Sequence, residues 1–254
     1  MRLALLASLF ASLLAAACAD DGHDSATFAT ATDVQLRRAI DVARFQDAGL
    51  MFEVAGALFG GNQTGCPAVS TTGLVTTVTT DCTTDNGWTV SGKLVITNFG
   101  FEDGPARDPA QPSSIEAFDL RASRDTELQT MDGKVEARLD GPTEDGGFRI
   151  SASIDVADSS LTAHTDGVMA CDASEQCHYE DAWISVDTLG DATIDAAPFT
   201  GDLGKVTLRG QDTLVIDVAR DDQGCFATTI DGAPRQLCES NLRAAPSAWR
   251  SILR

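Results

Sequence analysis

Residues 126–163 have the sequence TELQTMDGKVEARLDGPTEDGGFRISASIDVADSSLTA, and this stretch decides the fold class. Apolar and polar residues alternate through it, which is typical of strands with one buried face. The pairs Asp132-Gly133, Asp145-Gly146 and Asp158-Ser159 interrupt the alternation and favour tight turns. The stretch therefore predicts four successive antiparallel strands.

The pairing that these turns impose tests the strand assignment, because side chains change face with period two. The three turns place apolar residues opposite one another throughout, as in Leu128 with Ala137, Leu139 with Ala152, and Val156 with Leu161. One face of all four strands is then apolar and the other polar. Such a pattern predicts a meander with one side in water.

Similar Thr/Val/Ile-rich segments extend from residue 68 to residue 238, with further turn signals at Asn86-Gly87, Asp166-Gly167 and Asp231-Gly232. The total is about a dozen strands, and a sheet of that size tends to curl or to split into two layers. The sequence predicts a mainly β fold, namely a large curved antiparallel sheet in the form of a meander, a half-barrel or two layers.

Apolar residues recur at helical intervals in 33–59, among them Leu36, Ile40, Leu50 and Val54. They predict one long N-terminal amphipathic helix, or two helices broken near Gly49, packed on the sheet. Since no linker composition interrupts the strands that follow, residues 33–254 are expected to form a single domain.

The first seventeen residues have the three parts of an export signal. Met1-Arg2 supplies one positive charge, Leu3 to Leu14 is apolar, and three alanines precede Cys18. The apolar run is too short to span a bilayer about 30 Å thick. Residues 18–32 are expected to be a disordered acidic tether, because 20–32 lack periodic apolar positions.

The stretch Leu13-Leu14-Ala15-Ala16-Ala17-Cys18 resembles the lipobox of bacterial lipoproteins, with the leucine one place further from the cysteine than in the commonest pattern. The resemblance implies that Cys18 becomes the first mature residue and carries acyl chains, so that the membrane is a partner. Ala19, where some bacteria use aspartate to retain lipoproteins in the inner membrane, implies the outer membrane. Ordinary signal cleavage, giving a soluble secreted protein, is the alternative.

Composition excludes one class of partner. The chain has 38 acidic and 18 basic residues, a net charge of −20, which repels the phosphates of nucleic acids. An exported acidic protein gains solubility from such a surface, and cation binding is the competing explanation for the charge.

Six further cysteines form an even set, as expected for an exported protein: Cys66, Cys82, Cys171, Cys177, Cys225 and Cys238. They predict three disulfides among fifteen possible pairings. A type I′ turn at Asp231-Gly232 places Cys225 opposite Cys238 in a non-hydrogen-bonded pair, at a spacing that a disulfide accepts. Cys171 and Cys177 enclose a short loop, and Cys66 with Cys82 follows by elimination.

No motif commits the chain to a reaction. The histidines are His23, His164 and His178, none lies in a nucleophile motif, and disulfides would consume the thiols. Paired carboxylates for glycoside hydrolysis are conceivable, but one tyrosine and three tryptophans offer few sugar platforms. The sequence predicts a protein that is not an enzyme.

Metal and cofactor motifs are also lacking. The spacing Cys171-x5-Cys177-His178 differs from a zinc hook, and the acidic stretches 20–24 and 217–224 lack the ligand spacing of a calcium loop. No cofactor is predicted. The leading hypothesis is a cell-envelope lipoprotein that serves as a non-enzymatic structural or binding module. The alternative is a carrier or sensor of an acyl chain or other apolar ligand, since a helix on a curved sheet resembles the lipoprotein-carrier fold in outline.

Overall fold

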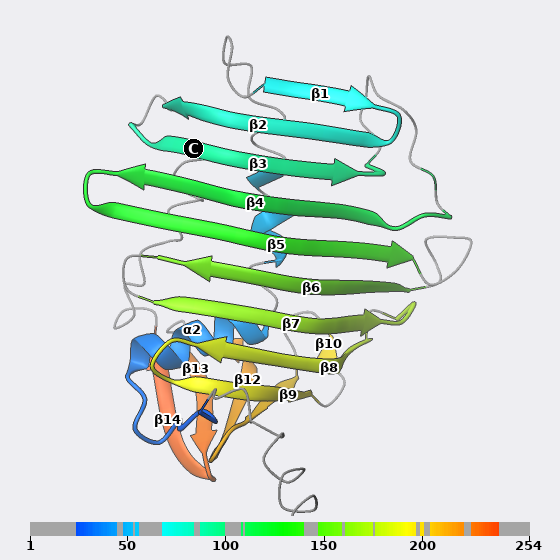
Figure 1. Cartoon of the computed structure of the whole chain (residues 1–254). Helices are drawn as coiled ribbons and strands as arrows, with labels where there is room; N and C mark the ends of the chain where they lie inside the picture. The colour runs from blue at the N-terminus through cyan, green and yellow to red at the C-terminus, as the bar shows by residue number, and fades with distance from the viewer. Residues whose placement is uncertain are drawn as a thin grey trace, which may run out of the picture.

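The computed structural model shows one domain built mainly from antiparallel strands (Figure 1). The residues it describes are 24–44, 48–52, 54–55, 68–83, 87–99, 108, 110–139, 147–158, 161–174, 176–196, 199–200, 204–220 and 225–238. The strands are β1 (Ala68–Thr72), β2 (Val75–Thr83), β3 (Thr89–Thr97), β4 (Ser113–Arg124), β5 (Glu127–Leu139), β6 (Phe148–Ala157), β7 (Thr162–Cys171), β8 (Gln176–Val186), β9 (Gly190–Ala196), β10 (Phe199–Thr200), β11 (Lys205–Arg209), β12 (Thr213–Arg220), β13 (Cys225–Ile230) and β14 (Ala233–Cys238).

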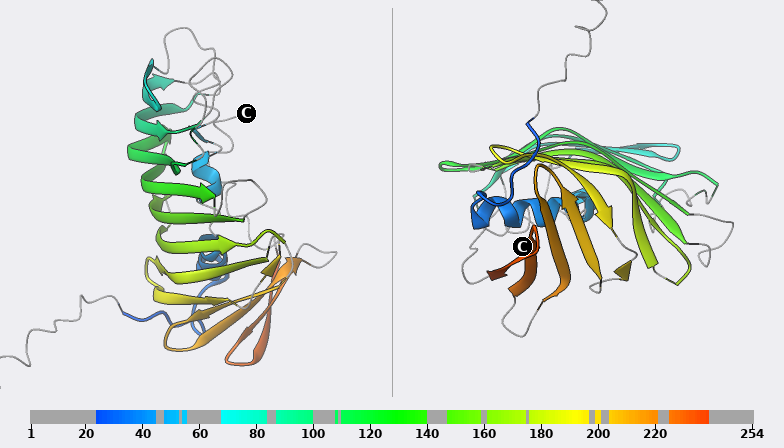
Figure 2. Two further views of the ribbon diagram at one scale, coloured as in Figure 1. Left: turned by 90° about the vertical axis from the view of Figure 1, so that its right-hand side faces the viewer. Right: turned by 90° about the horizontal axis from the view of Figure 1, so that it is seen from below.

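Thirteen of these strands follow the chain order across one open sheet, from β1 at one edge to β14 at the other. The two-residue β10 pairs with β8 beside this path. Every strand pair is antiparallel, so the predicted meander is confirmed, and it forms one unclosed sheet rather than two layers. Figure 2 shows that β11–β14 curl round, so that this end of the sheet wraps α2.

The N-terminal helix is shorter than expected. Helix α2 (Asp33–Ala43) is capped by Thr32, whose side chain accepts a hydrogen bond from the Gln35 backbone N–H while the Gln35 side chain accepts one from the Thr32 backbone N–H. It ends at Arg44, and helical residues resume at 48–52 and 54–55. The prediction of one long helix is therefore wrong. The break lies at Arg44, before the expected Gly49, because Arg44 leaves the helical conformation with ψ at 10°.

The folded domain begins before Asp33, within the segment expected to be a tether. Phe28 is fully buried, and its backbone N–H and that of Ala29 each donate to the Asp212 carboxylate over 2.6 Å. Ser25 forms a parallel bridge with Asp191 at the start of β9. The composition of 18–32 does not reveal this attachment, because it depends on a single aromatic residue, Phe28, and on the distant carboxylate of Asp212.

The predicted Asp231-Gly232 turn is confirmed in position and register. Both residues have positive φ, 47° and 81°, as a type I′ turn requires. Ile230 pairs with Ala233, and Cys225 pairs with Cys238. Gly87 has positive φ, 82°, just before β3, whereas Asn86, Asp145-Gly146 and Ser159 of the other predicted turns lie outside the described residues.

Two other predicted turns are wrong, since Asp132-Gly133 lies inside β5 and Asp166-Gly167 inside β7. Gly133 has φ +115°, and a side chain there would collide with the backbone of Ser153. These glycines therefore permit close contact between neighbouring strands rather than chain reversal. The turn before β5 falls at residues 125–126 instead.

Because residues 127–139 are one strand, the stretch 126–163 forms three strands rather than the predicted four, and the predicted pairing of Leu128 with Ala137 is wrong. The other two predicted registers of this stretch were shifted by an even number of residues. Leu139 pairs with Phe148 rather than Ala152, and Val156 pairs with Ala163 rather than Leu161. Even shifts keep the side chains of β6 and β7 on their expected faces, so the apolar alternation could not reveal them. Leu128 was assigned to the wrong face, since it is exposed on the side of β5 opposite to Val135.

The hydrophobic core lies on the face of the sheet that α2 covers. Helix α2 contributes its buried residues Leu36, Ala39, Ile40, Val42 and Ala43. The largest fully buried side chains include Trp88, Phe28 and Phe226. Packing of α2 is closest to β7 and β8, which leaves the opposite face of these strands free to carry polar groups.

Candidate functional site

The face of β6, β7 and β8 that points away from the core carries a polar and aromatic cluster. Ile154 and Val156 are buried, whereas Asp155 between them is exposed, so Asp155 lies on this outer face. The register then places His164 beside Asp155 and Ser185 beside His164. We call the cluster the β6–β8 face; it comprises Arg149, Asp155, His164, His178, Glu180 and Trp183.

His164 is held by one carboxylate and one aromatic ring. Its Nδ1 lies 2.8 Å from Oδ1 of Asp155, and its ring centroid lies 4.7 Å from that of Trp183, with the planes tilted by 31°. The imidazole side chain is 22% exposed, while Asp155 is 64% exposed. With Asp155 accepting from Nδ1–H, Nε2 is the nitrogen left to bind another group.

In a hydrolytic triad, a histidine is held by a carboxylate and contacts a nucleophilic hydroxyl or thiol. A nucleophile beside His164 would complete such a triad. Ser185 is the cross-strand neighbour of His164, yet no hydrogen bond joins the two side chains in the described part of the chain. General-base catalysis needs a nucleophile within hydrogen-bond reach of the base. Among the described residues, the side-chain contacts of His164 are thus those with Asp155 and Trp183.

A second set of contacts lies further along the same face. Glu180 joins Nη1 of Arg149 at 2.5 Å and Nε2 of His178 at 3.1 Å. Arg149 stands directly opposite Arg138 in the register of β5 and β6, an unfavourable like-charge pair that Glu180 relieves by drawing the Arg149 guanidinium towards β8. Because the three bridged side chains are 35–50% exposed, these ion pairs add little to stability.

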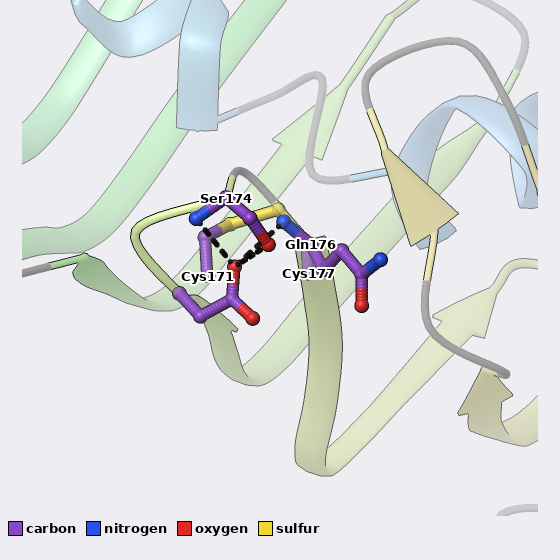
Figure 3. Close-up of a disulfide and its surroundings, with 5 residues drawn as sticks. Cys171, Ser174, Gln176 and Cys177 are labelled. Atoms are coloured by element: carbon purple, nitrogen blue, oxygen red, sulfur yellow. Dashed lines mark hydrogen bonds between the residues drawn. A yellow bond between two sulfur atoms is a disulfide. The ribbon is translucent and has the colours of Figure 1, made fainter.

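The loop next to this cluster is clamped by the Cys171–Cys177 disulfide, as Figure 3 shows. Oδ1 of Asp172 accepts hydrogen bonds from the Ser174 hydroxyl at 2.7 Å, the Ser174 N–H at 2.8 Å and the Gln176 N–H at 3.0 Å. The Ser174 hydroxyl first, and then the Gln176 and Ser174 N–H groups, hold the pKa of Asp172 below its ordinary value. The loop is thus fixed by both a covalent bond and an ionised side chain.

Two predicted disulfides are confirmed, Cys171–Cys177 and Cys225–Cys238, each with Cα atoms 3.9 Å apart. Cys82 is disulfide-bonded, and its expected partner Cys66 lies outside the described residues. Cys18 and His23 also lie outside them.

In the part of the chain that the structure describes, no group of three or more His, Cys, Asp or Glu side chains is placed so that it could hold a metal ion. Most of the acidic stretches 20–24 and 217–224 falls outside that part.

A shallow cavity lies where the N-terminal segment meets β9. Its volume is about 400 Å³, and its lining includes Asp24, Thr30, Gln35 and Thr188. Gln35 donates from Nε2 to the Thr188 hydroxyl over 2.6 Å across it. This lining is polar, so the cavity does not suit an acyl chain.

His164 and His178 are apparent from the sequence, but the partners of both histidines are not. The predicted register paired Asp155 with Thr162, two residues away from its true neighbour His164. Trp183 and Glu180 belong to no recognisable motif. Their positions beside β7 also depend on the bulge between Asp166 and Val168, which shifts the register of β7 and β8.

Comparisons with family models, with curated proteins and with solved structures found no match. Among the described residues, no helix has the length and apolar character needed to cross a bilayer.

Proposed function

We propose that the chain is a cell-envelope lipoprotein, anchored through Cys18, whose β domain is a non-enzymatic structural or binding module. The observation that carries the proposal is the pair of disulfides within the folded sheet. Disulfides persist where thiols are oxidised, outside the cytoplasm, which agrees with an export signal ending at Cys18. The similarity of that signal to a lipobox, followed by Ala19, supports attachment to the outer membrane.

The geometry of the β6–β8 face supports binding over catalysis. Its aromatic pair, Trp183 and His164, lies beside the Asp155 carboxylate, and the Arg149–Glu180 ion pair lies further along the same face. Such a surface offers stacking and hydrogen bonds to a polar ligand. The competing hypothesis, a carrier of an apolar ligand, needs an apolar cavity. In the described part, side chains of α2 pack into the curled end of the sheet, which favours the structural or binding module.

Mass spectrometry of the full-length chain expressed in a bacterial host tests the proposal. The membrane fraction is expected to contain a chain that begins at Cys18, carries acyl mass and has no free thiol among the other six cysteines. The matched control is Cys18→Ala, which should lose both the acyl mass and membrane attachment. A cytoplasmic chain with its leader intact and reduced Cys225 and Cys238 would refute the proposal.

A further inference from the structure

The two edges of the sheet are protected very differently. At the β14 edge, Pro234 pairs with Thr229 in a non-hydrogen-bonded position, so the N–H that proline lacks would have faced outwards. The next residue, Arg235, carries a charge and forms an ion pair with Asp33 beside α2. Proline and charge are both common devices against pairing with another chain.

Within Ala68–Thr72 the β1 edge has neither device, and Pro67 before it lies outside the described residues. Among the described residues, β1 pairs with β2 alone, and all five residues of β1 are exposed. No charged residue occurs from Ala68 to Thr80, although 22% of the chain is charged. Uncharged, Thr- and Val-rich strands have high β propensity, so an exposed edge of this composition favours strand addition.

The register shows which backbone groups point outwards. Residues 73–74 form a two-residue turn, so the flanking pair Thr72–Val75 is hydrogen-bonded, and alternate pairs are not. Ser70 therefore bonds to β2, whereas Val69 and Thr71 direct their N–H and C=O groups away from the sheet. These four groups are the template that another strand would meet.

We propose that the β1 edge pairs antiparallel with β1 of a second copy of this chain, so that two sheets become one. An antiparallel arrangement centred on Ser70 sets Val69 of each copy against Thr71 of the other, and these are the residues whose backbone groups point outwards. The uncharged edge suits a second copy, because it offers no carboxylate to attract a basic strand. Although each chain carries a net charge of −20, two copies that meet along the uncharged stretch 68–80 oppose no like charges there.

Cysteine cross-linking of the full-length chain in membranes tests this pairing. In the proposed register the two Ser70 residues form a non-hydrogen-bonded pair with Cα atoms about 4.5 Å apart, within disulfide range. Ser70→Cys is expected to give mostly covalent dimer on mild oxidation, seen on a non-reducing gel. The matched control is Thr79→Cys, which is also exposed but lies one strand inwards on β2, and it should stay monomeric.

A second variant separates pairing from folding. Val69→Pro removes an outward N–H without removing a bond to β2, so Ser70→Cys/Val69→Pro should lose the cross-link while keeping the thermal midpoint of Ser70→Cys. A Ser70→Cys chain that reacts with maleimide but forms no dimer would overturn the proposal. A cross-link from residue 70 to a different protein would overturn it too, since the edge would then receive a foreign strand.

Discussion

The Cys225–Cys238 disulfide should contribute measurably to the free energy of unfolding. The size of that contribution follows from the length of the loop that the bond closes. The bond joins residues thirteen positions apart, and closing such a loop in the unfolded chain is worth about 3 kcal/mol in the chain-entropy treatment. The Cys171–Cys177 bond spans six positions and is worth about 2.4 kcal/mol by the same treatment. The double variant Cys225→Ala/Cys238→Ala should therefore lose slightly more stability than Cys171→Ala/Cys177→Ala.

Urea unfolding of both double variants and the parent chain, followed by tryptophan fluorescence, measures these losses. The strands and their register should survive in each variant, but the slope of the free energy of unfolding against urea should rise, because the unfolded chain exposes more surface without the cross-link. The Asp231-Gly232 turn already favours the hairpin in the unfolded chain, which lowers the measured loss below the ideal value.

The reasoning fails if removing the Cys225–Cys238 bond costs less than about 1 kcal/mol, far below the chain-entropy value. It also fails if Cys171→Ala/Cys177→Ala is much the more costly pair. Either result would mean that strand pairing alone holds the last two strands.

Three further outcomes follow from single side chains. Asp212→Ala removes the acceptor of two N–H groups of residues 28–29 and should cost about 2–4 kcal/mol in thermal unfolding, whereas Asp212→Asn keeps one acceptor and should cost less. Burial raises the pKa of the Tyr179 hydroxyl, so above pH of about 10 the tyrosine ionises in the unfolded chain before it does so in the folded one, and stability falls. Tyr179→Phe should flatten that decline. Ultraviolet titration of this tyrosine, the only one in the sequence, should show no ionisation near pH 10 before the chain unfolds. The lowered pKa of Asp172 stabilises the fold above pH 3.8 and the gain is lost as pH falls below it, so Asp172→Asn should show a weaker acid dependence of unfolding, and an unchanged acid profile would contradict the role of its loop contacts.

Sequence patterns predicted the faces of the strands better than their positions. Alternation fixed which residues are buried, as with Ile154 and Val156, but registers two or four residues apart satisfy it equally. The Cys225–Cys238 hairpin was an exception, because its turn, its proline and its cysteine spacing all constrain one register.

The misplaced turns have a physical origin in glycine itself. Asp-Gly pairs favour positive φ, which serves a hairpin turn and a close strand contact equally well. Gly133 and Gly167 fill the second role, each facing the backbone of a neighbouring strand. Local sequence does not separate the two, because the deciding contact comes from a strand some 15 to 20 residues further along the chain.

The candidate site was harder still to predict. Asp155, His164 and Trp183 lie on three different strands, and their meeting depends on two registers and one bulge. The sequence showed the histidines but held no short motif for their partners.

The bridge between Ser25 and β9 sets how far the rest of the sheet extends from the N-terminal attachment. Eight strand-to-strand steps separate β9 from β1, which corresponds to about 40 Å at the usual spacing between neighbouring strands. Figure 1 shows the two at opposite ends of the flat part of the sheet. In the proposed lipoprotein, the β1–β2 hairpin would thus lie about 40 Å from the place where the N-terminal segment joins the sheet, a separation that leaves the β1 edge clear of the strands around that attachment.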